Sequence, residues 1–237
     1  MQDEVNELYR VFHSYRIGPD FSGCEHCVDP VESEQLATAE LRSLSLGDLG
    51  KYAFKAMTTW GDVCDFKHFL PRLFELVAHE DTDQFELEVL FRKLDYAGWY
   101  DWPPPERLAV GGYLLAFWHL AISARVRSPL DDSVDTALCA LGNACHTVNP
   151  FLELWTSERC PAAANQLAQF VLLNYDDILH PGRLYNSFWT GCEEQMHEVM
   201  AWLASPTTHE FMRCQMDDLE PHLTHVVALL ASIPPPR

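Results

Sequence analysis

The chain has 237 residues, and its 35 aspartate and glutamate residues against 16 lysine and arginine residues give a formal net charge of −19. A nucleic-acid-binding protein needs a basic face, because neutralising phosphates and releasing counterions supplies most of its affinity. We therefore expect no nucleic acid as a partner and no docking on an anionic membrane surface. A content of 48% apolar and 12% aromatic residues indicates a folded core and argues against a disordered chain.

The N-terminal residues lack the basic and apolar regions of a secretory signal. The most apolar stretch, residues 108–122, is shorter than the roughly 20 residues that a helix needs to cross a bilayer. Nothing therefore indicates an oxidising compartment, and we expect the eight cysteines to be reduced thiols. The chain is predicted to be a soluble cytoplasmic protein.

Apolar residues recur at helical spacing through most of the chain, and no run alternates as a strand would. We predict an all-α fold of stacked helical hairpins, as an irregular α-solenoid or a helical bundle, with no significant sheet. The predicted helices cover 5–15, 32–42, 46–59, 66–77, 85–94, 105–126, 132–146, 150–157, 161–175, 184–204, 207–215 and 217–232. In the fourth, Phe66, Phe69, Leu70, Leu73 and Val77 form a core stripe, Asp62 is the expected N-cap, and Pro71 predicts a kink or a late start.

The segment 99–105 is rich in aromatic residues and proline, and it is the best boundary within the chain. We expect one helical domain over 1–237, with a subdomain boundary near 99–105 that separates 1–98 from 106–237. The aromatic residues from Trp99 to Trp102 also allow a second interpretation, a binding site for a small ligand.

The most specific feature is a pair of cysteines, Cys24 and Cys27, in a segment without helical spacing. This spacing lets two thiolates bind one tetrahedral zinc ion from a turn. Cys64 and His68 are four residues apart, so both leave the same face of a predicted helix. Together these four residues would make a site of three cysteines and one histidine, and His26 could replace one ligand.

Three interpretations of this segment remain open. In the first, the zinc is structural and pins the cysteine segment to the helix. In the second, a metal-dependent enzyme uses Cys24, Cys27 and His68, with Asp62 or Asp65 as a general base. In the third, the cysteines only pack, and His68 is a surface residue hydrogen-bonded to Asp65. A redox dithiol is disfavoured, because no strand precedes the pair.

The segment from Cys24 to Leu76 resembles a family of uncharacterised bacterial proteins. The resemblance rests on three strings that follow the cysteine pair: Leu41-Arg42-x-Leu44, Tyr52-Ala53-x-Lys55-Ala56-x-Thr58-Thr59-Trp60-Gly61-Asp62, and Asp65-Phe66-x-His68-Phe69-Leu70-Pro71-Arg72-Leu73. It covers about the first third of the chain and implies no activity. It also implies that position 64 varies, which favours His68 over Cys64 as a ligand.

Other polar residues give weaker signals. Glu194 and His197 match half of a di-iron carboxylate motif, but the sequence has no second copy. A second metal site could use His209, His222, His225 and Cys214. His119 is expected to be a hydrogen-bonded core histidine. The pairs Cys145 with His146 and Cys192 with His197 carry no signature of a cysteine nucleophile.

Acidic residues recur in short clusters at 80–88, 131–135, 176–177, 193–198 and 217–220. Several clusters fall at predicted helix starts, where carboxylates complement the helix dipole. We expect a non-enzymatic module that binds a protein partner and holds a structural zinc ion. Whether the chain is instead an enzyme stays open. A third hypothesis is an acidic protein of the immunity or DNA-mimic type that neutralises a basic partner.

Overall fold

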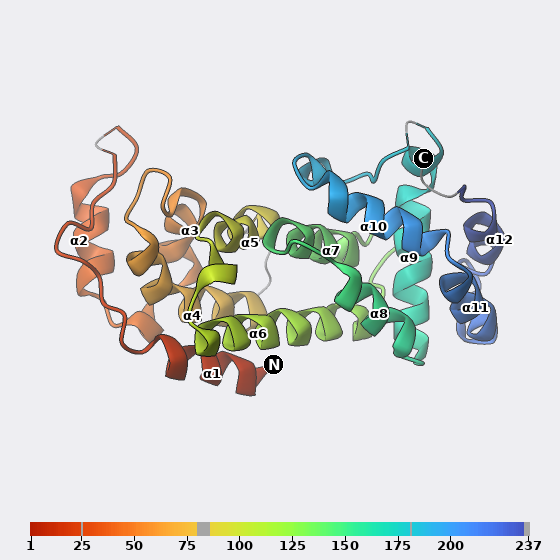
Figure 1. Cartoon of the computed structure of the whole chain (residues 1–237), viewed down its shortest axis with the longest axis horizontal. Helices are drawn as coiled ribbons and strands as arrows, with labels where there is room; N and C mark the ends of the chain where they lie inside the picture. The colour runs from red at the N-terminus through yellow and green to blue at the C-terminus, as the bar shows by residue number, and fades with distance from the viewer. Residues whose placement is uncertain (25, 80–85, 181, 235–237) are drawn as a thin grey trace. The chain divides into compact units, whose positions relative to one another are not determined.

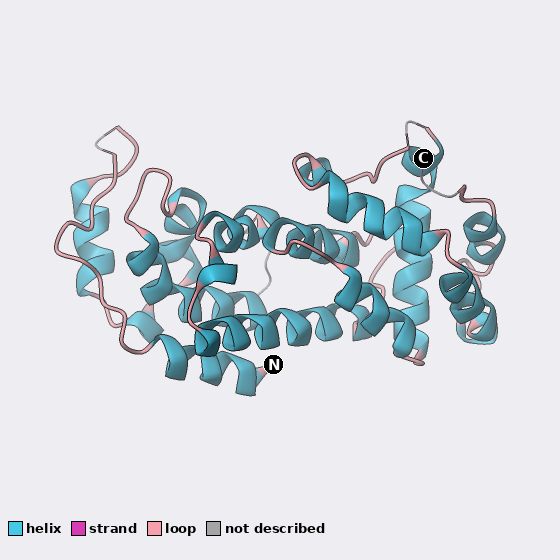
Figure 2. Ribbon diagram, in the orientation of Figure 1, coloured by secondary structure: helices cyan, strands magenta, loops and turns pink. Residues whose placement is uncertain are grey.

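The computed structural model describes residues 1–24, 26–79, 86–180 and 182–234. These residues contain twelve α-helices and no strand, which confirms the all-α prediction (Figure 2). The chain forms two compact units, residues 1–117 and 118–237, and the boundary falls inside one long helix, α6 (Pro104–Ser123).

The first unit contains five complete helices and the first part of α6 (Figure 1). The complete helices are α1 (Gln2–Phe12), α2 (Pro30–Thr38), α3 (Leu46–Lys55), α4 (Val63–His79) and α5 (Leu87–Tyr96). Two short 3-10 turns, η1 (Leu41–Ser43) and η3 (Trp99–Asp101), lie between them. Phe85 and the acidic residues at 80–83 lie outside the described residues.

Helix α4 is the centre of the first unit. Its predicted core stripe is confirmed, because all five residues are buried: Phe66, Phe69, Leu70, Leu73 and Val77. The helix packs against α1 and α3, and the ring of Phe69 lies 4.6 Å from that of Tyr52 in α3. Burial of these large side chains supplies the main favourable free energy of this unit.

The beginning of α4 is fixed by two carboxylates. The Oδ1 atom of Asp62 accepts hydrogen bonds from the backbone N–H groups of Cys64 (2.7 Å) and Asp65 (3.0 Å), which confirms its predicted role as an N-cap. In return, Oδ2 of Asp65 accepts from the N–H of Asp62 at 2.9 Å. The helix then continues through Pro71, so the late start that we considered does not occur.

The helix predicted for 46–59 ends early, at Lys55. Met57 has a φ of 62°, a left-handed conformation that stops a helix. The ammonium group of Lys93, in α5, donates to the carbonyl of Ala56 at 2.9 Å and so satisfies a backbone acceptor at the end of α3. This contact joins residues 37 positions apart, which local sequence patterns do not reveal.

The second unit contains six further helices: α7 (Ser133–Ala144), α8 (Asn149–Ser157), α9 (Pro161–Leu179), α10 (Glu193–Leu203), α11 (Pro206–Cys214) and α12 (Val226–Ala231). Its 3-10 turns are η4 (Ser187–Trp189) and η5 (Met216–Asp218). Trp155 is fully buried and packs edge-on against Trp118 at 5.0 Å and against Phe170 at 5.8 Å. Helices α7 and α9 contribute the most buried residues to this core, and α9 packs against α7 and α12.

The single helix predicted for 184–204 is wrong. The structure has η4, then a turn at Gly191 with a φ of 89°, and only then α10. The backbone breaks because Trp189 turns inward and is 2% exposed. A Cβ atom placed on Gly142 in α7 would lie 2.5 Å from the Trp189 ring, so this glycine makes room for the tryptophan.

The helix predicted for 217–232 is also too long, because only Val226–Ala231 is α-helical. The side-chain amide of Asn165, in α9, donates to the carbonyl of Asp218 at 3.1 Å. Its oxygen accepts from the N–H of Glu220 at 2.8 Å. These two bonds hold the backbone that follows η5, at 219–220, in a non-helical conformation and override the local helical pattern.

The predicted subdomain boundary near 99–105 lies inside the first unit. Trp99 and Trp102 are each 6% exposed, and the Trp102 indole N–H donates to the carbonyl of Ala97 at 3.0 Å. These aromatic residues belong to the packing of the first unit.

None of the described helices combines the length and the apolar character needed to cross a bilayer.

Two glycine substitutions test the packing of Trp189. Gly142→Ala should lower the free energy of unfolding by about 1–3 kcal/mol, because the new methyl group overlaps a buried ring that has no room to move. Gly111→Ala, in α6, meets no atom within 4 Å, so it should stabilise the helix by about 0.5–1 kcal/mol. Thermal unfolding of both variants checks this, and equal stabilisation by both would contradict it.

Candidate functional site

The cysteine pair lies in a tight turn. The N–H groups of Cys27 and Val28 donate to the carbonyl of Cys24 at 2.7 and 2.9 Å, and the N–H of Cys24 donates to Thr59 at 2.8 Å. Cys24 is exposed and Cys27 is half-buried, and neither forms a disulfide. The turn is thus attached to the segment that precedes α4, as the zinc prediction requires.

His68 and Cys64 differ in their surroundings. Cys64 is exposed in the first turn of α4. His68 is half-buried, and its Nδ1 lies 3.1 Å from the carbonyl oxygen of Tyr15. A carbonyl can only accept, so Nδ1–H is the donor and the neutral ring keeps a free lone pair on Nε2. Burial lowers the pKa of His68 and favours this neutral form, which is the form that binds metals.

Asp62 and Asp65 have structural partners. Asp65 is only 3% exposed, and it accepts from the N–H groups of both Gly18 and Asp62 at 2.9 Å. The expected hydrogen bond between His68 and Asp65 is replaced by the bond from His68 to Tyr15. The two carboxylates therefore fix the start of α4 and the chain that follows α1.

The described residues contain no group of three or more histidine, cysteine, aspartate or glutamate side chains arranged to hold a metal ion. His26 is exposed, and its neighbour at position 25 lies outside the described residues. The site of Cys24, Cys27, Cys64 and His68 stays a prediction.

A buried ionic cluster, missed in the sequence, lies beside His68. The ammonium group of Lys67 is 2.7 Å from Oε2 of Glu106, and both residues are 7% exposed. The Tyr15 hydroxyl donates to Oε1 of Glu106 at 2.8 Å and accepts from Lys67 at 3.1 Å. Lys67 also lies 4.1 Å from the centre of a Trp102 ring, a cation–π contact. No local pattern could reveal it, because Glu106 is 39 residues from Lys67.

A second cluster surrounds Glu75, near the exposed end of α4. Its carboxylate accepts from the Tyr9 hydroxyl (2.6 Å), from Arg72 (2.7 Å) and from Arg42 (3.1 Å). Burial and the hydrogen bond to Glu75 raise the pKa of Tyr9, so the phenol remains protonated. Arg42 also stacks over the Tyr9 ring at 3.6 Å. Arg42 and Arg72, which both belong to the sequence strings that resemble the bacterial family, thus connect η1 and α4 to α1.

The remaining histidines and cysteines do not form the sites considered from the sequence. His119 is exposed and lies 3.2 Å from Glu158, so its expected place in the core is wrong. Glu194 and His197 are both exposed, and the His197 ring bonds to the carbonyl of Glu193. His222 lies 3.7 Å from Glu220.

The cysteines other than Cys24 and Cys27 do not have the surroundings that a catalytic cysteine–histidine pair requires. Cys145 and Cys192 are buried, whereas His146 and His225 are exposed. His209 is partly buried on α11. The thiol of Cys214 donates to Glu210 and not to a histidine.

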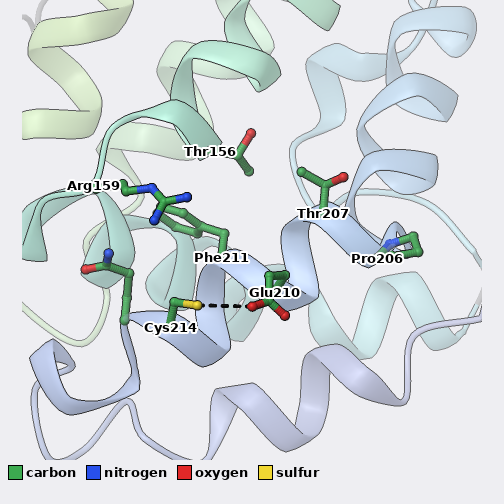
Figure 3. A pocket seen from close by; sticks show the side chains of 8 residues that line it. Thr156, Arg159, Pro206, Thr207, Glu210, Phe211 and Cys214 are labelled. Atoms are coloured by element: carbon green, nitrogen blue, oxygen red, sulfur yellow. Dashed lines mark hydrogen bonds between the residues drawn. The ribbon is translucent and has the colours of Figure 1, made fainter.

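The second unit has a cleft with a volume of about 530 Å³, which the sequence did not predict (Figure 3). One wall comes from the end of α8 and the link to α9, with Thr156 and Arg159, and the other from α11. The residues from α11 and its C-cap are Pro206, Thr207, Glu210, Phe211, Cys214 and Gln215. Of all these, only Cys214 stood out in the sequence, as a possible metal ligand.

Comparisons with known proteins assign no function to these sites. No family model, no curated protein and no solved structure matches the chain. The function must therefore be argued from the residues of the chain itself.

Elemental analysis of the purified protein tests the zinc prediction. We expect about one zinc ion per chain, bound by Cys24 and Cys27 together with His68 and Cys64. The Cys24→Ala/Cys27→Ala variant should lose the metal and unfold at a lower temperature, because binding free energy contributes to folding. Cys214→Ala removes another exposed thiol and is the matched control, with unchanged metal content. A substoichiometric metal content, with unchanged stability of the double variant, would contradict the prediction.

Proposed function

We propose that this chain is a non-enzymatic interaction protein whose second unit binds a partner protein with a basic face. The observation that carries the proposal is a set of exposed carboxylates in this unit without a partner among the described side chains: Asp132, Glu153, Asp176, Glu194, Asp217 and Asp218. A charge that forms no internal contact is available to another molecule.

Other acidic residues of the second unit have a structural role and do not belong to this set. Asp131 accepts from the N–H groups of Arg127 and Ser133, and Asp135 is 1% exposed and accepts from the Asn174 amide. Glu198 binds the N–H of Val148 at 2.7 Å. Asp177 and Glu210 pair with arginines. The clusters seen in the sequence are therefore partly structural, and the remaining exposed carboxylates support a binding role.

The second unit carries a negative formal charge, although the first unit, with 21 acidic and 10 basic residues, is more negative at −11. The segment 118–237 has 14 acidic residues against six arginines and no lysine, a formal charge of −8. Arg127, Arg183 and Arg213 are already paired with carboxylates of the same unit. The field around the unit therefore attracts cations and repels nucleic acid.

Three exposed apolar side chains of the second unit can add contact area: Leu130 (83% exposed), Tyr185 (59%) and Met216 (47%). Aromatic residues and methionine are enriched in protein interfaces. Met216 directly precedes Asp217 and Asp218 in η5, so an apolar contact and two negative charges are available in one short segment.

Two other functions from the sequence remain proposals. An immunity or DNA-mimic protein is a special case of basic-partner binding, and competition by duplex DNA for the partner separates the two. A metal-dependent enzyme using Cys24, Cys27 and His68 has less support, because Asp65 is buried and used at the start of α4.

Affinity purification followed by calorimetry with the purified partner tests the proposal. We expect a partner with an excess of lysine and arginine on its bound face, and a dissociation constant that rises steeply with salt, since exposed charges are screened beyond about 8–10 Å. Neutralising Asp132, Asp176, Glu194, Asp217 and Asp218 to their amides should raise the dissociation constant at least about tenfold, which corresponds to about 1.4 kcal/mol.

The matched control neutralises five exposed carboxylates of the first unit: Asp3, Asp20, Glu34, Glu40 and Asp101. It changes the net charge by the same amount and should have a much smaller effect. Equal effects of the two variants would show a non-specific response to net charge, and an affinity independent of salt would contradict an acidic interface.

A further inference from the structure

The cleft of the second unit is lined in part by the polar residue Gln215. Gln215, the C-cap residue of α11, is 8% exposed and lines the cleft. Its backbone N–H donates to Phe211, but its side-chain amide has no hydrogen-bond partner among the described residues. An amide has both donors and an acceptor, so this side chain can hydrogen-bond to a polar group of a ligand in the cleft.

The opposite wall supplies a positive charge. Arg159 lies in the link between α8 and α9, and in Figure 3 its side chain extends into the cleft on the side of Phe211. No carboxylate of the described chain pairs with Arg159, whereas Arg127, Arg183 and Arg213 of the same unit are paired. A guanidinium group binds a carboxylate through two parallel N–H bonds.

The carboxylate that lines the cleft, that of Glu210, already has partners within the unit. Glu210 forms an ion pair with Arg213, and one of its oxygens accepts the thiol hydrogen of Cys214 at 3.2 Å (Figure 3). The charge without a partner is therefore positive and belongs to Arg159. The surrounding unit has a formal charge of −8, which disfavours ligands with several negative charges.

Apolar and hydroxyl groups complete the lining. Phe211 and Pro206 provide apolar surface, and Thr156 and Thr207 each contribute a hydroxyl group. Thr207 is in the first turn of α11, where Ser205 already caps the N–H of Thr208. A volume of about 530 Å³ lies in the range of about 300–1,000 Å³ that is typical of small-molecule sites.

We propose that this cleft binds a small organic monocarboxylate with an aromatic or apolar body. The carboxylate pairs with Arg159, the amide of Gln215 hydrogen-bonds to a polar atom of the ligand, and the apolar body packs against Phe211. The site is independent of the partner-binding surface proposed above and would exist even if that proposal failed.

Alkylation of Cys214 by iodoacetamide, followed by peptide mass spectrometry, tests the site. Three probes are compared: phenylacetate, its neutral amide phenylacetamide, which has nearly the same shape, and the larger carboxylate indole-3-acetate. The two carboxylates should slow alkylation of Cys214 in a saturable way, while the exposed thiols of Cys24 and Cys64 react at unchanged rates. Phenylacetamide should need at least about tenfold more ligand for the same protection, because it lacks the charge that pairs with Arg159.

Two variants locate the effect. Arg159→Gln should raise the half-protecting concentration of phenylacetate at least about tenfold, whereas Arg125→Gln, another exposed arginine of the same unit outside the cleft, should leave it unchanged. Equal protection by phenylacetate and phenylacetamide, equal effects of the two arginine variants, or no protection of Cys214 by either carboxylate would overturn the proposal.

Discussion

The first unit depends on one buried ion pair, between Lys67 of α4 and Glu106 in the first turn of α6. Together with Tyr15 it joins three segments of the chain: the residues after α1, the N-terminal part of α4 and the start of α6. Removing two charges from water is costly, and the pair is tolerated because Tyr15 and Trp102 supply further contacts. Such a pair fixes which surfaces of the helices meet, because any other arrangement leaves a charge buried alone.

This role changes how the polar residues at 60–75 are interpreted. In the sequence, His68 was a candidate zinc ligand and Asp65 a candidate general base. In the structure, Asp65 holds the start of α4, His68 binds the backbone after α1, and Arg72 donates to the carbonyl of Leu44. These three residues of the strings that carry the family resemblance thus have roles in folding. The proposed partner and ligand sites lie in the second unit.

Local patterns predicted what local physics determines. The helical class, the core stripe of α4 and the cap at Asp62 all follow from spacing and from unsatisfied backbone groups within a few residues. The errors occurred where a distant side chain decides the backbone conformation. Trp189 against Gly142 interrupts one predicted helix, and Asn165 fixes the non-helical backbone at 219–220. The cleft was missed for the same reason, because Arg159 lies in the link between α8 and α9 and Gln215 at the end of α11, far apart in the sequence.

A double-mutant cycle on Lys67 and Glu106, followed by chemical denaturation, tests the central claim most directly. Lys67→Met alone leaves Glu106 buried without its counter-charge and should lower the free energy of unfolding by about 3–5 kcal/mol. The double variant Lys67→Met/Glu106→Leu removes both charges and should recover most of this loss. If Lys67→Met is as stable as the wild type, or if the two substitutions destabilise additively, Lys67 and Glu106 are not coupled and the pair does not constrain how α4 and the start of α6 meet.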